Sequence, residues 1–399
     1  MSNRRNFLKV AGAASMFPAV SSGAEVQANN AVQQYARLGR TDLKISDISF
    51  GTSRLREGME DVVAFALDRG INYFDSAEGY TGGDSEKVLG RALAGKRDQV
   101  YIVSKSILSA KTSAQTMMRS LEESLVRLNT DYVDVYMNHA VNDVDVVANP
   151  EWLAFVEQAK QQGKIRFSGL SGHGGYLIDC LDFALDEDMV DVVLTAFNFG
   201  QDPKFYEGLT RGLDWIATQP DLPRVLAKAK QKDVGVVAMK TLHGARLNDM
   251  RPYEKGGATF AQAAFKWVLG HDSVDALVVT MTEKSQVDEY LGASGQTAIA
   301  THDRRLLERY AQMQSGTACK YACNTCESSC PYNVSIPDVM RTRMYATDYG
   351  DVEFARDEYA LIAADASPCL SCSGEPCKGA CPHGIQVHEL CTPTHNMLA

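Results

Sequence analysis

The feature that most constrains the fold is a regular alternation of short β-rich runs and helical stretches between about residues 34 and 298. Eight runs are rich in β-branched and aromatic residues, and stretches with helical periodicity separate them. Eight such strand–helix units in about 250 residues predict an α/β fold, a closed (β/α)8 barrel of the TIM type. The predicted strands are Ile48–Gly51, Asn72–Asp75, Val100–Val103, Val133–Tyr136, Ile165–Ser168, Val190–Thr195, Gly235–Met239 and Ala276–Thr280.

The pattern also predicts what surrounds these strands. Helices are expected at Met59–Arg69, Ser113–Leu128 and Gln262–Leu269, and Tyr35–Ser46 is expected to form a small hairpin that closes the bottom of the barrel. We therefore place the barrel at residues 34–300, between an N-terminal segment, 1–33, and a small, mainly helical C-terminal domain, 301–399.

Nine of the ten cysteines lie in the last 81 residues, and eight of these form two runs that each end in Cys-Pro. Closely spaced thiolates converge on one centre, and the runs resemble the C-x2-C-x2-C-x3-C-P pattern of bacterial two-cluster ferredoxins. Two 4Fe-4S clusters are therefore predicted, although the spacing within each run departs from the pattern at one place. Zinc sites and a disulfide framework remain alternatives. The expected ligands are Cys319, Cys323, Cys326, Cys330, Cys369, Cys372, Cys377 and Cys381.

In ferredoxins of this kind the fourth cysteine of each run serves the other cluster. The resemblance therefore implies that Cys381 joins the first three cysteines of the first run, and that Cys330 joins the first three of the second. Cys391 and Cys180 are expected to be packed thiols rather than ligands.

The N-terminus resembles a twin-arginine export signal. Arg4-Arg5-Asn6-Phe7-Leu8-Lys9 precedes a short apolar run, and an Ala-x-Ala-like ending follows at Ala28. The resemblance implies export of the folded protein to the periplasm, which suits clusters that are assembled inside the cell. No stretch approaches the roughly 18 apolar residues of a membrane span, so stable membrane insertion is not expected.

Composition narrows the choice of partners. The chain has 399 residues, 45% of them hydrophobic, and a formal net charge of −10. This describes an acidic chain that can bury a large core, and nucleic acid is not an expected partner.

Four polar residues lie at successive predicted strand ends or in the loop beyond one: Asp75, Tyr80, Lys105 and His139. Strand ends at the carboxyl face of such barrels carry the chemistry, so these side chains are expected to share one site. Tyr80 can protonate the alkoxide left by carbonyl reduction if its pKa, about 10 unperturbed, is lowered, and Lys105 is expected to lower it. Asp75 would keep the lysine charged, His139 would donate to the carbonyl oxygen, and no metal is required.

The sequence around these residues resembles the signature of the aldo-keto reductase family. The matching runs are Phe74–Tyr80, Gly83–Gly90, Val103–Lys105 and Tyr136–His139, and the resemblance covers the whole barrel. It implies reduction of an aldehyde or ketone, with a sugar derivative among the candidates, by NADP or NAD, so a small carbonyl compound or alcohol is the expected substrate. Some members carry a cysteine-rich extension that resembles helical ferredoxins.

Dinucleotide binding is where the sequence departs from the family. Gly172 and His173 follow Ser171 in place of the usual asparagine, and Leu194 replaces a glutamine. The strand-eight loop does not decide between NADP and NAD. The residues expected to contact the dinucleotide are Ser171, Asn198, Met239, Lys240 and Leu242.

Two other functions remain open from the sequence. The four residues could transfer a proton next to a carbonyl without net redox, or the chain could be an iron-sulfur electron-transfer or binding module with the barrel as scaffold. Free nicotinamide cofactor is not expected in a periplasm, so a redox partner acting through the clusters is a further expectation. If no redox partner acts through them, the clusters are expected to stabilise the fold of the C-terminal domain.

Overall fold

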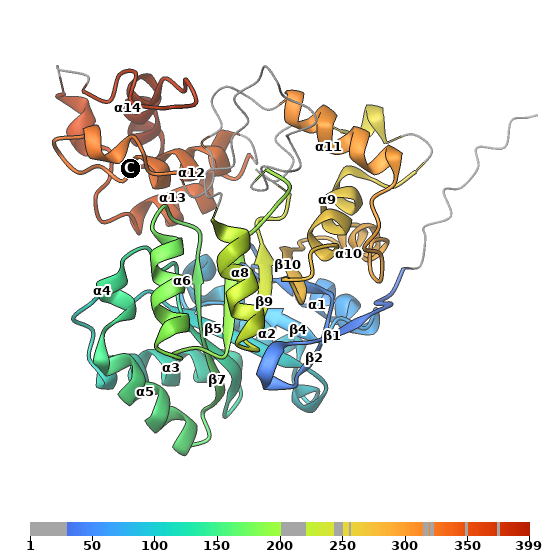
Figure 1. Cartoon of the computed structure of the whole chain (residues 1–399). Helices are drawn as coiled ribbons and strands as arrows, with labels where there is room; N and C mark the ends of the chain where they lie inside the picture. Colours follow the sequence, from blue (N-terminus) through green and yellow to red (C-terminus); the bar gives the residue numbers. More distant parts are fainter. Residues whose placement is uncertain are drawn as a thin grey trace, which may run out of the picture.

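The computed structural model describes residues 30–200, 221–242, 250–254, 257–313, 319, 323–347, 350–372 and 376–399 (Figure 1). The expected export signal up to Ala28 lies outside these residues, so it stays a prediction.

Eight parallel strands form a closed barrel. They are β3 (Ile48–Gly51), β4 (Tyr73–Asp75), β5 (Tyr101–Ser106), β6 (Val133–Asn138), β7 (Ile165–Gly172), β8 (Val192–Ala196), β9 (Gly235–Met239) and β10 (Ala276–Thr280). Their order around the barrel follows the chain, and β10 closes it by pairing with β3. The predicted (β/α)8 barrel is confirmed.

The bounds of β3, β9 and β10 are those predicted, whereas β7 runs four residues beyond the predicted end at Ser168. This extension contains two glycines, Gly169 and Gly172, and glycine is typical of strand ends. In the structure they allow close packing instead, because a Cβ at Gly169 would collide with the backbone of Val192 in β8, and a Cβ at Gly172 would collide with Leu177.

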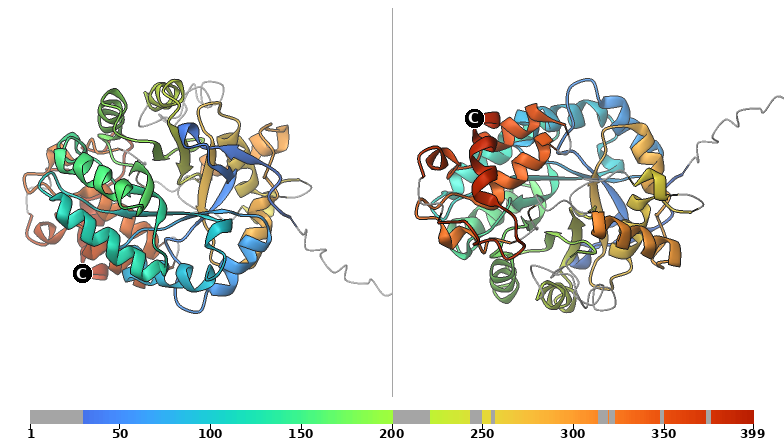
Figure 2. Two further views of the ribbon diagram at one scale, coloured as in Figure 1. Left: turned by 90° about the horizontal axis from the view of Figure 1, so that it is seen from below. Right: turned by 90° about the horizontal axis from the view of Figure 1, so that it is seen from above.

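The helices surround the strands (Figure 2). The predicted helix start at Ser113 agrees with capping, because Ser113 accepts a hydrogen bond from the Thr116 amide. The helix predicted at Gln262–Leu269 begins two residues earlier, at Phe260, where Thr259 forms a capping box with Gln262. The barrel helices are α1 (Glu60–Asp68), α2 (Asp84–Ala92), α3 (Ala114–Leu128), α4 (Val144–Val147), α5 (Pro150–Gln161), α6 (Leu177–Asp186), α8 (Leu222–Gln231), α9 (Phe260–Leu269) and α10 (Lys284–Leu291).

The expected hairpin forms from β1 (Tyr35–Arg37) and β2 (Lys44–Ser46). Leu38, Leu43 and Ile45 are buried in one cluster with side chains of the barrel interior, so the hairpin plugs the amino-terminal end of the barrel as predicted.

In the part of the chain that the structure describes, four α-helices follow the barrel: α11 (Thr301–Met313), α12 (Ile336–Thr347), α13 (Val352–Ala360) and α14 (Val387–Leu398). The first packs against barrel helix α9, where the rings of Phe260 and Tyr310 stack with their centroids 4.2 Å apart. The other three share a small apolar core of their own and lie over one side of the barrel's end (Figures 1 and 2). Among the described residues, no helix combines the length and apolar character that a membrane crossing needs.

Candidate active site

A cavity of about 800 Å³ lies at the carboxyl ends of the barrel strands. Residues at the ends of β3, β4, β5, β7, β9 and β10 form its floor, and residues of α12 and α13 form the facing wall. The cavity is therefore enclosed by two parts of the molecule, the barrel rim and the C-terminal helices.

The structure brings the four strand-end residues together in this cavity. Lys105 is fully buried, and its Nζ donates to Asp75 Oδ1 at 2.8 Å and to the carbonyl oxygen of Ser76 at 2.6 Å. The same ammonium lies 3.5 Å from the Tyr80 hydroxyl. The ring of His139 meets the Tyr80 ring edge to face, with centroids 5.6 Å apart. The arrangement is a chain of contacts from carboxylate to ammonium to phenol, with an imidazole beside the phenol.

Burial controls the protonation of this group. It raises the pKa of Tyr80 well above its usual value, and the charges of Asp75 and Glu358 add to the effect. The expectation of a lowered Tyr80 pKa is therefore wrong, because burial is the largest cause of the shift and raises this pKa. Burial also lowers the pKa of His139 well below its usual value, with help from the charge of Lys105. Tyr80 is thus a protonated phenol and His139 a neutral imidazole near pH 7.

The ion pair itself is costly to bury. Loss of solvation raises the pKa of Asp75 and lowers that of Lys105, and their mutual attraction opposes both shifts. Asp75 Oδ2 is buried and has no hydrogen-bond partner among the described residues. A buried oxygen without a partner is expensive, and such groups are common where a ligand binds.

Glu86 and Ser85 support the site from behind, and sequence reasoning gave neither a role. Glu86 is fully buried and accepts hydrogen bonds from Ser104 and from Arg127, whose Nε lies 2.7 Å from Glu86 Oε2. Ser85 donates to Thr52 Oγ1 at 2.6 Å. These contacts tie α2 to β3 and β5, next to Lys105. The sequence did contain a signal for Ser85 and Glu86, because both lie in the Gly83–Gly90 run that carried the family resemblance.

Four of the five residues expected to contact a dinucleotide line the cavity: Ser171, Met239, Lys240 and Leu242. Asn198 lies behind them, where it donates to the carbonyl oxygen of Lys240 at 3.1 Å and accepts from the Gly200 amide. Asn198 thus holds the backbone at Lys240 in place.

Lys240 is unusual in both backbone and charge. Its φ of 55° lies in the left-handed region, which costs a residue other than glycine on the order of 1 kcal/mol. Burial lowers the pKa of Lys240 to about 7, and the charge of Arg341 adds to the shift. The neighbouring Thr241 hydroxyl is buried and has no partner among the described residues. Strain, a shifted pKa and an unsatisfied hydroxyl together mark this turn as a ligand contact.

Sequence reasoning missed the facing wall. Arg341 of α12 lies 3.3 Å from the ring nitrogens of His173 and forms an ion pair with Asp338 at 2.9 Å. Tyr345 follows one helical turn later, and Phe354 and Glu358 come from α13. Nothing in the sequence of α12 or α13 indicates that they dock on a barrel rim, so only the fold could reveal these residues.

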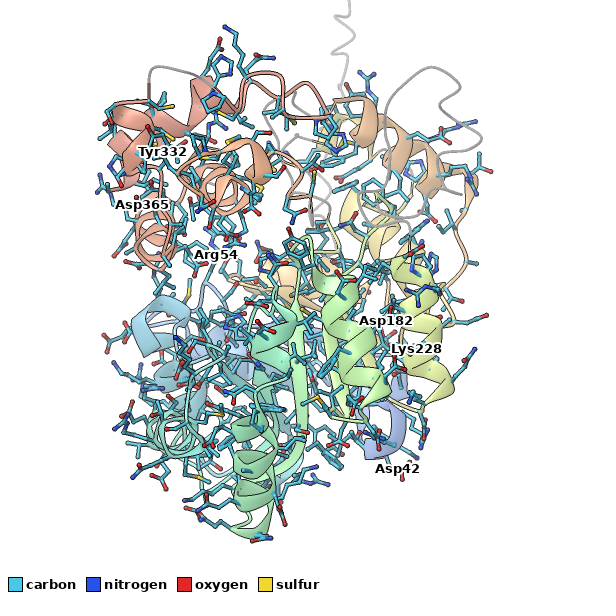
Figure 3. All side chains as sticks on the ribbon, turned by 60° about the vertical axis from the view of Figure 1, so that its left-hand side comes forward. Asp42, Arg54, Asp182, Lys228, Tyr332 and Asp365 are labelled. Carbon is cyan, nitrogen blue, oxygen red and sulfur yellow. The ribbon has the colours of Figure 1, made fainter. Side chains whose placement is uncertain are left out.

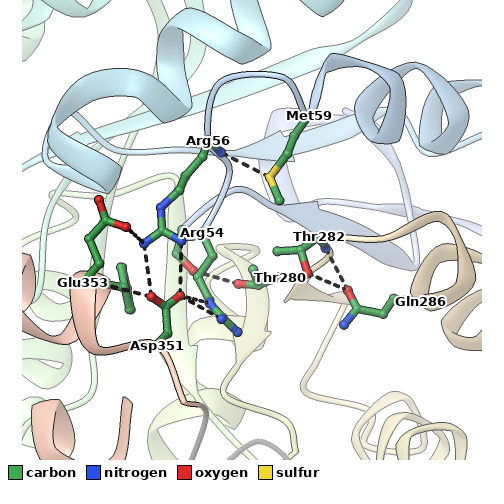
Figure 4. A network of polar contacts seen from close by, with 10 residues as sticks. Arg54, Arg56, Met59, Thr280, Thr282, Gln286, Asp351 and Glu353 are labelled. Carbon is green, nitrogen blue, oxygen red and sulfur yellow. Dashed lines mark hydrogen bonds and ion pairs between the residues drawn. The ribbon is translucent and has the colours of Figure 1, made fainter. Parts of the chain in front are cut away.

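An ionic clamp holds the wall to the barrel (Figure 4). Asp351 pairs with Arg54 at 2.8 Å and with Arg56 at 3.2 Å, and its own side chain is only 9% exposed. It also caps α13 by accepting from the Phe354 amide. Arg54 lies where the barrel meets the C-terminal helices (Figure 3). Burial alone would raise the pKa of Asp351, but the hydrogen bonds from Arg56 and Arg54 hold this pKa below its usual value.

A second contact joins the two parts on the side of the cysteines. Gly175, in the loop after β7, packs so closely that a Cβ would collide with the side chain of Asn324. A small cavity behind this contact is lined by Cys319, Cys323 and Arg341. The loop that carries His173 therefore rests on the first cysteine run.

None of the ten cysteines forms a disulfide. Burial raises the pKa of Cys326 to about 12, and the neighbouring thiols of Cys323 and Cys381 contribute. Among the described residues, no group of three or more histidine, cysteine, aspartate or glutamate side chains is placed to hold a single metal ion.

The second run shows a similar grouping. Burial raises the pKa of Cys369, and its neighbouring thiols are those of Cys330, Cys377 and Cys372. Cys391, which is buried, is a hydrogen-bond partner of Cys369. Each cysteine run thus has one member of the other run as a neighbour.

Comparison with known proteins places these observations in a family. The model of the aldo/keto reductase family matches residues 47–252. The match contains all four residues of the buried group and ends before the C-terminal helices.

Relatives match over a similar region. The chain is 30% identical to L-galactose dehydrogenase of Arabidopsis thaliana over 297 residues, which is 64% of this chain and 86% of that protein. It is 31% identical over 217 residues to methylglyoxal reductase YeaE of Escherichia coli, covering 53% of this chain and 70% of the relative. An aldo/keto reductase structure from Klebsiella pneumoniae, in complex with NADP and acetate, has the same fold, with a TM-score of 0.54 and 24% identity over 70% of this chain and 96% of that one.

Proposed function

Because the chain belongs to the aldo/keto reductase family, we propose that it is an NAD(P)-dependent oxidoreductase that interconverts a small carbonyl compound and its alcohol. The observation that carries this proposal is the contact chain Asp75–Lys105–Tyr80, with steps of 2.8 Å and 3.5 Å, in the floor of one cavity. The names of the relatives, a galactose dehydrogenase and a methylglyoxal reductase, support a small oxygenated substrate.

The residues of the cavity suit a dinucleotide. Ser171, Met239 and Leu242 would line its nicotinamide end, and the ammonium of Lys240 would approach a phosphate. The unpartnered Thr241 hydroxyl offers one more hydrogen bond. The chemistry that NAD(P)H would supply, when bound, is the hydride for the carbonyl carbon.

The proton comes from the protein. Tyr80 holds its proton firmly, yet an alkoxide is a far stronger base than a phenolate, so transfer to the alkoxide is downhill. The negative charge left on the Tyr80 oxygen develops 3.5 Å from Lys105 Nζ, which stabilises it. Neutral His139 can donate its N–H to the carbonyl oxygen and polarise the bond before the proton moves.

Replacing Tyr80 tests this role. Tyr80→Phe keeps the ring that packs on His139 but removes the proton, so carbonyl reduction should fall by roughly 100-fold or more while NAD(P)H still binds. Tyr101→Phe, at the opposite end of β5 from Lys105, is the matched control and should keep full activity. The measurement is the rate of NAD(P)H oxidation with an aldehyde. Undiminished turnover in Tyr80→Phe would exclude Tyr80 as the donor, and isomerisation of the substrate without NAD(P)H oxidation would favour proton transfer without net redox.

We further propose that the two cysteine groups hold 4Fe-4S clusters, available to a redox partner. Support comes from the donor set: none of the eight cysteines forms a disulfide, and Cys326 and Cys369 each have a thiol of the other run as a neighbour.

Export is proposed on the sequence alone. The Arg4-Arg5 run would direct the folded protein to the periplasm by the twin-arginine route. Fractionation of cells that express the full chain, followed by detection of the protein in the periplasmic extract, tests this.

A further inference from the structure

The two groups of proposed metal ligands differ in what lies next to them. The first group comprises Cys319, Cys323, Cys326 and Cys381, and the second comprises Cys330, Cys369, Cys372 and Cys377. Two members of the first group, Cys319 and Cys323, line the small cavity behind the loop after β7. No member of the second group, all four of which the structure describes, lines this cavity or the large one at the barrel rim.

The small cavity and the active-site cavity are separated by one layer of residues, which we call the partition. Five residues line both cavities: Asn142, His173, Gly174, Asp338 and Arg341. Arg341 joins the two sides of the partition, because it lies 3.3 Å from the ring nitrogens of His173 in the barrel and pairs at 2.9 Å with Asp338 in α12. The first cysteine group therefore lies directly behind the cavity proposed to hold the dinucleotide.

The loop after β7, residues 173–176, packs tightly against the first cysteine run. A Cβ on Gly175 would collide with the side chain of Asn324. Asn324 directly follows Cys323, and its carbonyl oxygen accepts a hydrogen bond from the Glu327 amide at 2.9 Å, within the cysteine run. Because close-packed contacts transmit displacement, a shift of this turn towards the barrel displaces the loop.

The other side of the same segment touches the reacting group. Ser171, at the end of β7, accepts from the Ala140 amide at 3.1 Å, and its carbonyl oxygen accepts from the Val141 amide at 2.8 Å. Ala140 directly follows His139. The segment from Ser171 to Gly175 therefore connects a proposed dinucleotide contact and the backbone beside the catalytic imidazole with the first cysteine run.

Metal loading acts mainly on the cysteine side of this connection. Coordination draws four thiolates to one centre and so restrains the turns that carry them. The barrel has a large core of its own, whereas the core of the C-terminal helices is small and includes Cys326 and Cys391. A dinucleotide that contacts Ser171 restrains the loop from the other side. Two ligands that favour one position of a shared segment raise each other's affinity by the same factor.

We infer that metal loading of the first cysteine group raises the affinity for the dinucleotide through the partition, with Asn324 and Arg341 as positioning residues, and that loading of the second group does not. The inference rests on the proposed function for the identity of both ligands. It goes further in coupling their two sites and in giving the two cysteine groups different tasks.

Loss of one cysteine group at a time tests the coupling. Cys323→Ser and Cys372→Ser should each lower the iron content from about eight to about four per chain. The Kd for NADPH or NADH, measured by fluorescence titration, should rise about tenfold or more in Cys323→Ser. It should stay at the parent value in Cys372→Ser, the matched control. An equal rise in both variants would show a general loosening of the C-terminal helices and overturn the inference, as would an unchanged Kd in Cys323→Ser.

A variant that keeps every proposed ligand tests the route. Asn324→Ala removes the side chain that packs on Gly175, so it should keep the parent iron content, but its Kd for the dinucleotide should no longer change when a chelator removes the iron. Ser328→Ala, exposed in the same cysteine run, is the control and should keep the parent response to the chelator. A parent-like response in Asn324→Ala would overturn the inference.

Hydrogen exchange separates this inference from the proposed reaction. The Tyr176 amide, which donates to Asn142 Oδ1 at 2.8 Å, should exchange about tenfold faster in Cys323→Ser than in Cys372→Ser. If the parent binds neither NADPH nor NADH but exchange responds in this way, the proposed reaction fails and the link from the first group to the loop stands. If carbonyls are reduced while neither Kd nor exchange responds to Cys323→Ser, the coupling is excluded and the reaction stands. A parent protein that holds no metal would exclude the coupling together with the proposed clusters.

Discussion

Two lysines in one cavity differ in how their charge is maintained. Lys105 is fully buried but is paired with Asp75 at 2.8 Å, whereas burial lowers the pKa of Lys240 to about 7. A lysine whose pKa is near 7 can become protonated when an anionic ligand binds beside it. Lys105 is therefore suited to constant support of Tyr80, and Lys240 to sensing an anionic ligand.

The pKa of Lys240 predicts the pH dependence of dinucleotide binding. A phosphate raises the pKa of a lysine that binds it, so the added affinity is fully present below pH 7 and is lost as pH rises above 7. Above pH 7, affinity should fall by up to about tenfold per pH unit. Fluorescence titration with NAD(P)H between pH 6 and pH 9 measures this. Lys240→Met should bind more weakly at pH 6 and lose the pH dependence, and a pH profile that is the same in both proteins would contradict the assignment.

At the scale of elements, the sequence predicted the bounds of strands that are determined by neighbouring residues in the chain. Strand bounds at Ile48–Gly51 and Gly235–Met239 were correct because β-branched runs and their flanking residues mark them. The position of α13 could not be predicted, because Asp351 meets Arg54 and Arg56 across 297 and 295 residues of chain. Burial, which decides the protonation of Tyr80, is likewise a property of the assembled cavity and not of the residues beside it.

The clamp should control how firmly the wall is held. Asp351→Asn removes the charge that Arg54 and Arg56 share but keeps a side chain that can cap α13. Because both arginines are about a third exposed, the loss should be roughly 1–2 kcal/mol, which corresponds to about tenfold faster amide exchange in α13. Hydrogen-exchange mass spectrometry measures this. Asp42→Asn, which breaks an exposed ion pair with Arg37 near the other end of the barrel, should leave α13 unaffected (Figure 3). Unchanged exchange in the Asp351 variant would mean that apolar packing alone holds the helix.

The whole molecule combines cores of very different size. A large core fills the space between strands and barrel helices, whereas α12, α13 and α14 share a small one that includes Cys326 and Cys391. A segment this short buries little apolar surface and commonly relies on bound metal for its stability. The strand–helix alternation predicted the barrel, and the strand-end positions of the four polar residues predicted their grouping, but sequence spacing could not show that the cysteine-rich segment completes the cavity.

Cysteine replacement tests the proposed clusters at this scale. Anaerobically purified protein should contain about eight iron and eight sulfide per chain, and Cys381→Ser should lower both to about four if this residue completes the first cysteine group. Cys180→Ser, buried in α6 of the barrel, is the control and should keep the full content. Iron and acid-labile sulfide analysis decides the result. Zinc in place of iron in the parent protein would exclude the clusters.

The clamp at Asp351 also separates two tasks along the chain. The residues proposed to carry out the reaction lie between Asp75 and His139, and those of the facing wall lie in α12 and α13, joined to the barrel rim by ion pairs and close packing. Changes in these helices can alter which molecule is accepted without moving the groups that transfer the proton. The two ends of such a gene can therefore diverge at different rates, with a slowly changing half that keeps the reaction and a faster one that adapts the enzyme to new compounds.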